Sequence, residues 1–142
     1  MTAPQKHEKS LLIRRNLEEI KLIAREVESW GTLHNWTQEA IYDVSLALEE
    51  LVSNIIHHGF DDDRAHSIII KFSLKGPELT VRITDFGKPF NPLEAPPPDL
   101  SHSVKERPLG GLWIHLARGT VDEIRYEREH EENRLTIRKR VS

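Results

Sequence analysis

The chain of 142 residues contains no cysteine. Disulfide bonds, thiolate metal sites and a cysteine nucleophile are therefore excluded. The chain also lacks any apolar run of about 18 residues, the minimum for a helix that spans a bilayer. Its first residues include no apolar segment of the kind that secretory signal peptides contain. We therefore expect a cytoplasmic protein without a membrane segment.

Neither sign of charge dominates the chain. The formal net charge is −3 at pH 7, which argues against a broad surface that binds nucleic acid directly. The one dense basic stretch, Arg138–Arg140, is typical of a solvated chain end. Eight histidines are present, but no His-x-x-x-His pair falls on a predicted helix, so we expect no zinc site. The length predicts one domain over residues 1–142.

Two amphipathic helices are predicted in the first half of the chain. The first begins after the N-cap residue Asn16 and runs over residues 17–30, and we expect Gly31 to end it. The second begins after the N-cap residue Thr37 and ends at His58. Apolar residues recur along both segments every three or four positions, as one buried helix face requires.

The remaining periodic segments are predicted strands and one further helix. The residues from Lys75 to Glu78 separate two β-branched runs and predict a hairpin turn. A third helix is expected to begin at Gly110. This order predicts an α+β fold, a two-layer sandwich with helices on one face of a mixed, mostly antiparallel sheet. The predicted strands are residues 10–15, 67–74, 79–84, 121–127 and 133–137.

The segment from Pro89 to Pro108 differs from the rest of the chain. It holds most of the prolines, few apolar residues and no periodic pattern. A long segment of this kind inside a compact domain is usually functional or disordered. Two interpretations remain open at this point: a mobile lid over about residues 93–109, or an insertion without a function.

One face of the second predicted helix carries an unusual set of residues. A solvated helix face normally has long charged side chains, whereas this one includes an alanine and an asparagine. Taken by itself, the helix leaves two interpretations open, because its polar residues could be surface residues or part of a site. The residues that share this face are Asp43, Ala47, Glu50, Asn54 and His57.

Three segments, in order along the chain, resemble the motifs of the GHKL ATPase superfamily. Leu48–Phe60 resembles its N-box, in which a glutamate precedes an asparagine by four residues. Asp85–Pro92 resembles the adenine-binding box, in the Asp-x-Gly-x-Pro-Phe-Asn-Pro form of anti-sigma-factor serine kinases. Leu109–Arg118 resembles the glycine box, and Val121–Tyr126 and Asn133–Lys139 resemble the closing strands. The resemblance extends from the first strand to the end of the chain.

The resemblance implies a Bergerat (GHKL) fold that binds ATP and Mg²⁺. By this resemblance Glu50 is the general base for the attacking hydroxyl, and Asn54 is the protein ligand of Mg²⁺. An asparagine oxygen suits Mg²⁺, which prefers oxygen ligands and is usually held by few protein groups together with phosphates. Asp85, at the end of a strand, accepts a hydrogen bond from the adenine amino group.

The same resemblance assigns the other nucleotide contacts. Gly87 gives the backbone room to approach the base edge, and the free N–H groups at a glycine-rich helix start suit phosphates. Lys105 and Arg107 are candidate partners of the γ-phosphate. The full set of expected nucleotide contacts is Asn54, Asp85, Gly87, Pro89, Phe90, Lys105, Arg107, Gly110, Gly111 and Leu112.

The implied activity is that of a serine/threonine protein kinase. Such proteins phosphorylate a small anti-sigma-factor antagonist and alternatively sequester a sigma factor, and a homodimer is compatible with this reading. Trp113 stands where the family commonly has the last glycine of its glycine box, and Lys88 replaces a second glycine after Asp-x-Gly. Trp113 favours an alternative, a non-catalytic, nucleotide-gated module that binds a partner. An ATPase without a protein substrate would need appended machinery that this short chain lacks.

Overall fold

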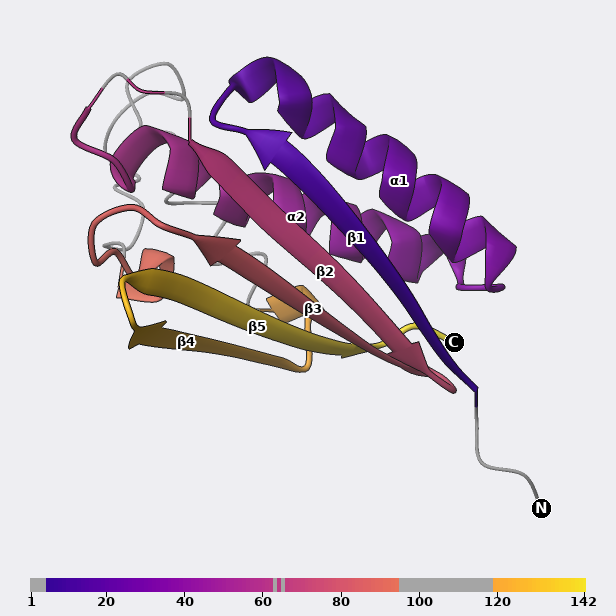
Figure 1. The fold of residues 1–142 in the computed structure, drawn as a ribbon. Coiled ribbons are helices and arrows are strands. Elements are labelled where there is room, and N and C mark those ends of the chain that lie inside the picture. Colours follow the sequence, from indigo (N-terminus) through magenta and orange to yellow (C-terminus); the bar gives the residue numbers. More distant parts are fainter. Residues whose placement is uncertain (1–4, 63, 65, 95–118) are drawn as a thin grey trace, which may run out of the picture.

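The part of the chain that the structure describes consists of one five-stranded sheet and two long helices (Figure 1). The computed structural model describes residues 5–62, 64, 66–94 and 119–142. Short 3₁₀ turns occupy Leu17–Glu19 and Pro92–Glu94. The longer elements are β1 (Lys6–Arg14), α1 (Ile20–Leu33), α2 (Gln38–His58), β2 (Ser67–Lys75), β3 (Glu78–Asp85), β4 (Glu123–Glu129) and β5 (Glu132–Arg140).

The strands lie in the order β1-β2-β3-β5-β4. Every pair of neighbouring strands in the described part of the chain is antiparallel. The predicted hairpin joins β2 to β3, and Gly76 in its turn has a φ of 57°, which glycine adopts without strain. The two-layer α+β fold is confirmed, and the described sheet contains antiparallel pairs only.

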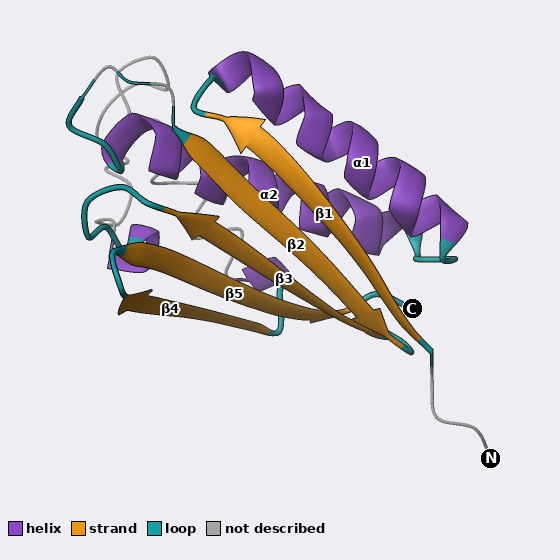
Figure 2. Ribbon diagram, in the orientation of Figure 1, coloured by secondary structure: helices purple, strands orange, loops and turns teal. Residues whose placement is uncertain are grey.

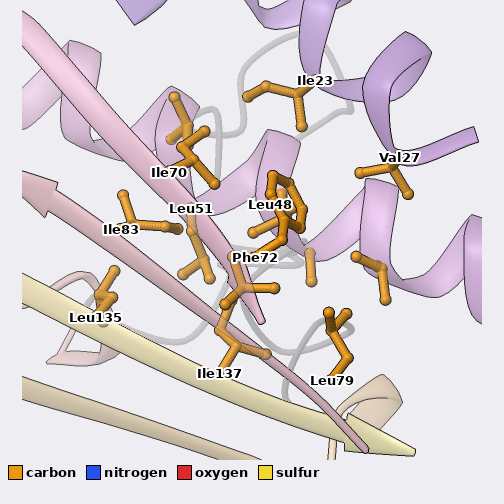
Figure 3. Close-up of a cluster of buried hydrophobic side chains, with 14 of the residues drawn as sticks. Ile23, Val27, Leu48, Leu51, Ile70, Phe72, Leu79, Ile83, Leu135 and Ile137 are labelled. Carbon is orange, nitrogen blue, oxygen red and sulfur yellow. The ribbon is translucent and has the colours of Figure 1, made fainter. Parts of the chain in front are cut away.

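Both helices cover the same face of the sheet (Figure 2). In β2 the side chains of Ile68, Ile70, Phe72 and Leu74 are buried, whereas the intervening ones are exposed or half-buried. This alternation follows from the period of two along a strand. The side chains of α2, including Leu48, pack against the sheet to form the core (Figure 3).

The boundaries of α2 agree with the prediction. The Thr37 side chain accepts a hydrogen bond from the Ala40 backbone N–H at 3.0 Å, which confirms the N-cap. The predicted N-cap of the first helix is also confirmed, because the Asn16 side chain accepts a hydrogen bond from the Glu18 backbone N–H at 2.9 Å and the 3₁₀ turn from Leu17 leads directly into α1, but the predicted end is wrong.

Gly31 does not end α1. An added Cβ at Gly31 would lie 2.8 Å from a side-chain atom of Ile41 and 2.8 Å from one of Trp36, so this glycine allows close packing. The chain reverses later, at Asn35, whose φ is 61°.

Strand boundaries shift by a few residues. β1 begins at Lys6 rather than at residue 10, because it pairs with β2 along its whole length, from Lys6 opposite Lys75 onwards. β4 begins at Glu123 rather than at Val121. Most of the expected third helix and nearly all of the expected lid lie outside the described residues. No helix in the described ranges is long and apolar enough to cross a membrane.

Candidate functional site

The centre of α2 carries two polar side chains into the interior. Glu50 is 8% exposed and Asn54 is 4% exposed. The side-chain amide of Asn54 donates a hydrogen bond to Glu50 Oε1 at 3.1 Å. The two residues lie about one helical turn apart, so the helix itself sets this contact. The interpretation of both as surface residues is therefore wrong.

The other three residues of the same helix face do not join this pair. Asp43 lies 3.6 Å from the Lys139 ammonium, which comes from β5. His57 is exposed near the end of α2. Ala47 is buried in the core. The helix therefore brings together Glu50 and Asn54 alone among the five residues that share its face.

Burial changes the protonation of Glu50. Desolvation raises the pKa of this carboxyl to about 7, and the hydrogen bond from Asn54 opposes the rise. A carboxyl with a pKa near neutrality is poised to accept a proton and to return it, which is what a general base requires. The ionised form is costly in this environment because burial removes its hydration.

The raised pKa predicts a pH-dependent effect of Glu50 on stability. A carboxyl whose pKa is higher in the folded state binds more protons there, so its contribution to stability falls as pH rises from about 4.5 to about 7. At pH 8, Glu50→Gln should therefore stabilise the fold by about 1–3 kcal/mol. Urea unfolding of the wild type and of Glu50→Gln at pH 4 and pH 8 measures this difference in stability. If the free energies of unfolding of Glu50→Gln and the wild type differed by the same amount at pH 4 and at pH 8, the prediction would be contradicted.

A second buried carboxylate, that of Asp85, lies at the end of β3. Asp85 is 2% exposed, and its burial raises the pKa of the carboxyl, against hydrogen bonds from Asn133 and Gly87 that lower it. The Gly87 backbone N–H donates to Asp85 Oδ1 at 2.9 Å, and the Asn133 side chain donates to the same oxygen at 3.0 Å. Oδ2 accepts no hydrogen bond from the residues that the structure describes. Oδ1 is thus fixed by two donors, whereas Oδ2 has none among the described residues.

Sequence reasoning missed the residue that holds Asp85 in place. Asn133, in β5, is 3% exposed and lies directly opposite Asp85 in the β3–β5 register. Its side-chain amide also donates to the Lys88 backbone oxygen at 2.8 Å. Its side-chain oxygen accepts from the Tyr126 hydroxyl at 2.5 Å and from the Phe90 backbone N–H at 3.4 Å. The available signal was a polar residue on the core-facing side of an otherwise apolar strand.

The loop after β3 is packed against the end of α2. An added Cβ at Gly87 would lie 2.2 Å from the Gly59 backbone oxygen. The neighbouring Lys88 backbone N–H donates to that oxygen at 3.0 Å, and Arg128 donates to the Gly87 backbone oxygen at 2.7 Å. Close contact with α2 is therefore sufficient to require a glycine here, a reason different from the expected approach to a base.

Of the remaining expected nucleotide contacts, only Pro89 and Phe90 belong to the described part of the chain. Pro89 is exposed, and the Phe90 ring lies 5.9 Å from the His58 ring. The described residues contain no group of three histidine, cysteine or acidic side chains that could hold a metal ion. Several expected site residues lie outside the described part of the chain: Lys105, Arg107, Gly110, Gly111, Leu112 and Trp113.

Comparison with known proteins supports the motif analysis. The histidine kinase-like ATPase domain family matches residues 13–139. The serine/threonine-protein kinase BtrW of Bordetella bronchiseptica is 26% identical over 102 residues, which cover 72% of this chain and 72% of that protein. The serine-protein kinase RsbW of Bacillus subtilis is 25% identical over 115 residues, which cover 78% of this chain and 71% of that protein.

A solved structure shows the same fold. It is the crystal structure of the RsbU and RsbW domains of Rv1364c from Mycobacterium tuberculosis. The TM-score is 0.69, and the sequences are 17% identical. The match covers 95% of this chain but 32% of the larger protein. The structural match shows a shared fold only. The family relationship rests on the family match over residues 13–139.

Proposed function

Because the chain belongs to the histidine kinase-like ATPase domain family, we propose that it binds ATP with Mg²⁺ and phosphorylates a serine or threonine of a partner protein. The observation that carries this proposal is the buried Glu50–Asn54 pair on α2. A buried carboxylate of raised pKa next to an amide is costly for stability, and such groups cluster at functional sites.

The side chain of Asn54 fits a magnesium ligand. Its amide nitrogen is engaged with Glu50, which leaves the side-chain oxygen available. Mg²⁺ prefers oxygen ligands and usually keeps several waters beside one or two protein groups and phosphates. When bound, the ion neutralises the charge that develops on the phosphate oxygens. Asn54 would hold it without adding a further negative charge beside the triphosphate.

Glu50 would act on the hydroxyl of the partner protein. As that hydroxyl attacks the γ-phosphorus, its proton passes to the Glu50 carboxylate, and the bond from the γ-phosphorus to the bridging oxygen of ADP breaks. The hydrogen bond from Asn54 to Oε1 orients the carboxylate. Because the pKa of Glu50 is about 7, a substantial fraction of the molecules carry the ionised base at neutral pH.

Asp85 would recognise the adenine base. Its Oδ1 is occupied by two donors, so Oδ2 is the oxygen that would accept from the adenine amino group. The phosphate contacts proposed for Gly110, Gly111 and Leu112, with Lys105 and Arg107, rest on the sequence motif. Relatives named serine-protein kinases support phosphoryl transfer as the activity of this site.

We propose further that the phosphorylated partner is a small anti-sigma-factor antagonist and that the chain also sequesters a sigma factor. The resemblance of Asp85–Pro92 to the anti-sigma-factor kinase motif supports this assignment. The second candidate function is a nucleotide-gated module that sequesters a partner without phosphorylating it. Trp113 favours it, because an indole where the backbone approaches phosphate would hinder turnover.

The experiment that tests this proposal is a transfer assay with ATP labelled at the γ-phosphate. The purified chain is incubated with Mg²⁺ and with candidate antagonist proteins. We expect label on one antagonist and none on its variant with the acceptor serine replaced by alanine. Binding of ATP without transfer to any partner would favour the sequestering module instead.

A further inference from the structure

We infer that Asn133, braced by Tyr126, is a positioning residue that fixes Asp85 and thereby sets the preference for adenine over guanine nucleotides. This inference rests on the proposed function, because it concerns the base contact of the same site. Asn133 comes from β5, which pairs with β3, and Tyr126 comes from β4, the edge strand, which pairs with β5 (Figure 1). Both lie in segments that resemble the closing strands of the family, but neither is among the nucleotide contacts that the resemblance implies.

The amide of Asn133 is held from both ends. Its nitrogen has two hydrogens, and they go to Asp85 Oδ1 at 3.0 Å and to the Lys88 backbone oxygen at 2.8 Å. Its oxygen accepts from the Tyr126 hydroxyl at 2.5 Å. An amide whose two donors are both engaged, and whose oxygen is also bonded, has one orientation. Inverting the group would turn its oxygen toward the Asp85 carboxylate and the Lys88 carbonyl, so that both donor contacts would be lost.

The position of Asn133 follows from the sheet. Asp85 ends β3 and Asn133 lies directly opposite it in the β3–β5 register. Both side chains point to the helix-covered face, where Leu135 and Ile137 continue the core along β5. Asn133 is only 3% exposed on this face, and a buried polar side chain is normally hydrogen-bonded. The register of β3 and β5 therefore places the Asn133 side-chain amide, a fixed hydrogen-bond donor, next to the Asp85 carboxylate.

Fixing one oxygen of Asp85 determines what the other can do. With Oδ1 accepting from both Gly87 and Asn133, the carboxylate cannot rotate freely, and Oδ2 is the remaining acceptor. Adenine presents an amino donor at its 6-position, whereas guanine presents an oxygen there. An ionised, fixed carboxylate accepts from the first and repels the second.

Loss of the Asn133 donor should relax this discrimination. Burial favours the neutral form of Asp85, and the hydrogen bonds from Asn133 and Gly87 favour the ionised form, as do the nearby charges of Arg128 and His66. Without Asn133 the pKa of Asp85 should rise further. A protonated carboxyl can donate to the guanine oxygen, so guanine would be tolerated better and adenine less well.

The variants for the test are Asn133→Leu, which removes the donor at similar volume, and Tyr126→Phe, which removes only the brace. Thr136→Val is the matched control, because Thr136 lies on the same strand but on the opposite face. If Asn133→Leu does not fold, Tyr126→Phe decides the outcome. Tyr126→Phe should change the pKa of Asp85 and the ratio of the dissociation constants for GTP and ATP in the same direction as Asn133→Leu, by a smaller amount.

The first measurement is a titration of the Asp85 carboxyl by ¹³C NMR without nucleotide. We expect a higher pKa in Asn133→Leu and Tyr126→Phe than in the wild type, and no change in Thr136→Val. A pKa of Asp85 that is the same in all four proteins would overturn the inference. Because no nucleotide is present, this result does not depend on the proposed kinase function.

The second measurement is the ratio of the dissociation constants for GTP and ATP, by calorimetry. We expect Asn133→Leu to lower this ratio about 10-fold or more, as the loss of a hydrogen bond to a charged group implies. An unchanged ratio in both variants, with ATP bound by the wild type, would overturn the inference. A wild type that binds neither nucleotide would contradict the proposed function, whereas the NMR titration would still decide whether Asn133 controls Asp85.

Discussion

Replacing Glu50 with alanine should lower phosphoryl transfer about 10²–10⁴-fold while ATP and the partner protein still bind. The side chain acts on the attacking hydroxyl in the transition state, so its loss affects the rate more than ground-state binding. Transfer should also rise with pH through about 7 in the wild type, because the ionised carboxylate is the form that accepts the proton. Single-turnover transfer rates from pH 5.5 to 8.5 measure both effects.

Glu49 provides the matched control for this prediction. It has the same side chain, on the same helix, and burial raises the pKa of its carboxyl too. It points about 100° away from Glu50 around the helix axis, and the Asn54 amide bonds to Glu50. Glu49→Ala should therefore leave transfer nearly unchanged. If Glu49→Ala abolished transfer and Glu50→Ala spared it, the assignment of the base would be wrong by one residue.

Replacing Asp85 with asparagine should weaken ATP binding about 10- to 100-fold, the range expected for a hydrogen bond to a charged group. Asp85 is proposed to contact the base in the ground state, so its loss appears in the dissociation constant. Asparagine also offers an amide in place of one carboxylate oxygen, and this amide would face the amino group of adenine. Calorimetry with Mg-ATP gives the effect directly.

The comparison between Asp85→Asn and Glu50→Ala separates recognition of the base from catalysis. Glu50→Ala should bind ATP within a few-fold of the wild type, whereas Asp85→Asn should not. Circular dichroism and urea unfolding establish that both variants are folded. Equal losses of affinity in the two variants would show that Glu50 contributes to ground-state binding, against the role proposed for it.

Local sequence signals predicted most of the fold. The apolar period of α2, its N-cap Thr37 and the hairpin between β2 and β3 each depend on neighbouring residues, and each is confirmed. Gly31 was misinterpreted because a glycine that ends a helix and a glycine that allows close packing look the same in sequence. Only the contact of α1 with Trp36 and Ile41 distinguishes the two cases.

The site was predictable only as far as its residues lie within contiguous motifs. Glu50 and Asn54 lie one turn apart on one helix, so their contact follows from helix geometry. The contact between Asp85 and Asn133 joins residues 48 positions apart. It depends on the register of two strands that are not consecutive in the chain, and no local pattern contains that information. The close contact of Gly87 with Gly59 was out of reach for the same reason.

Calorimetric titration of the purified chain with ATP in the presence of Mg²⁺ tests the central claim most directly. We predict binding at one site per chain, weakened when Mg²⁺ is replaced by a chelator and weakened about 10- to 100-fold by Asp85→Asn. The absence of any binding by the wild-type chain at millimolar ATP would contradict the account, because every role proposed for Glu50, Asn54 and Asp85 requires a bound nucleotide.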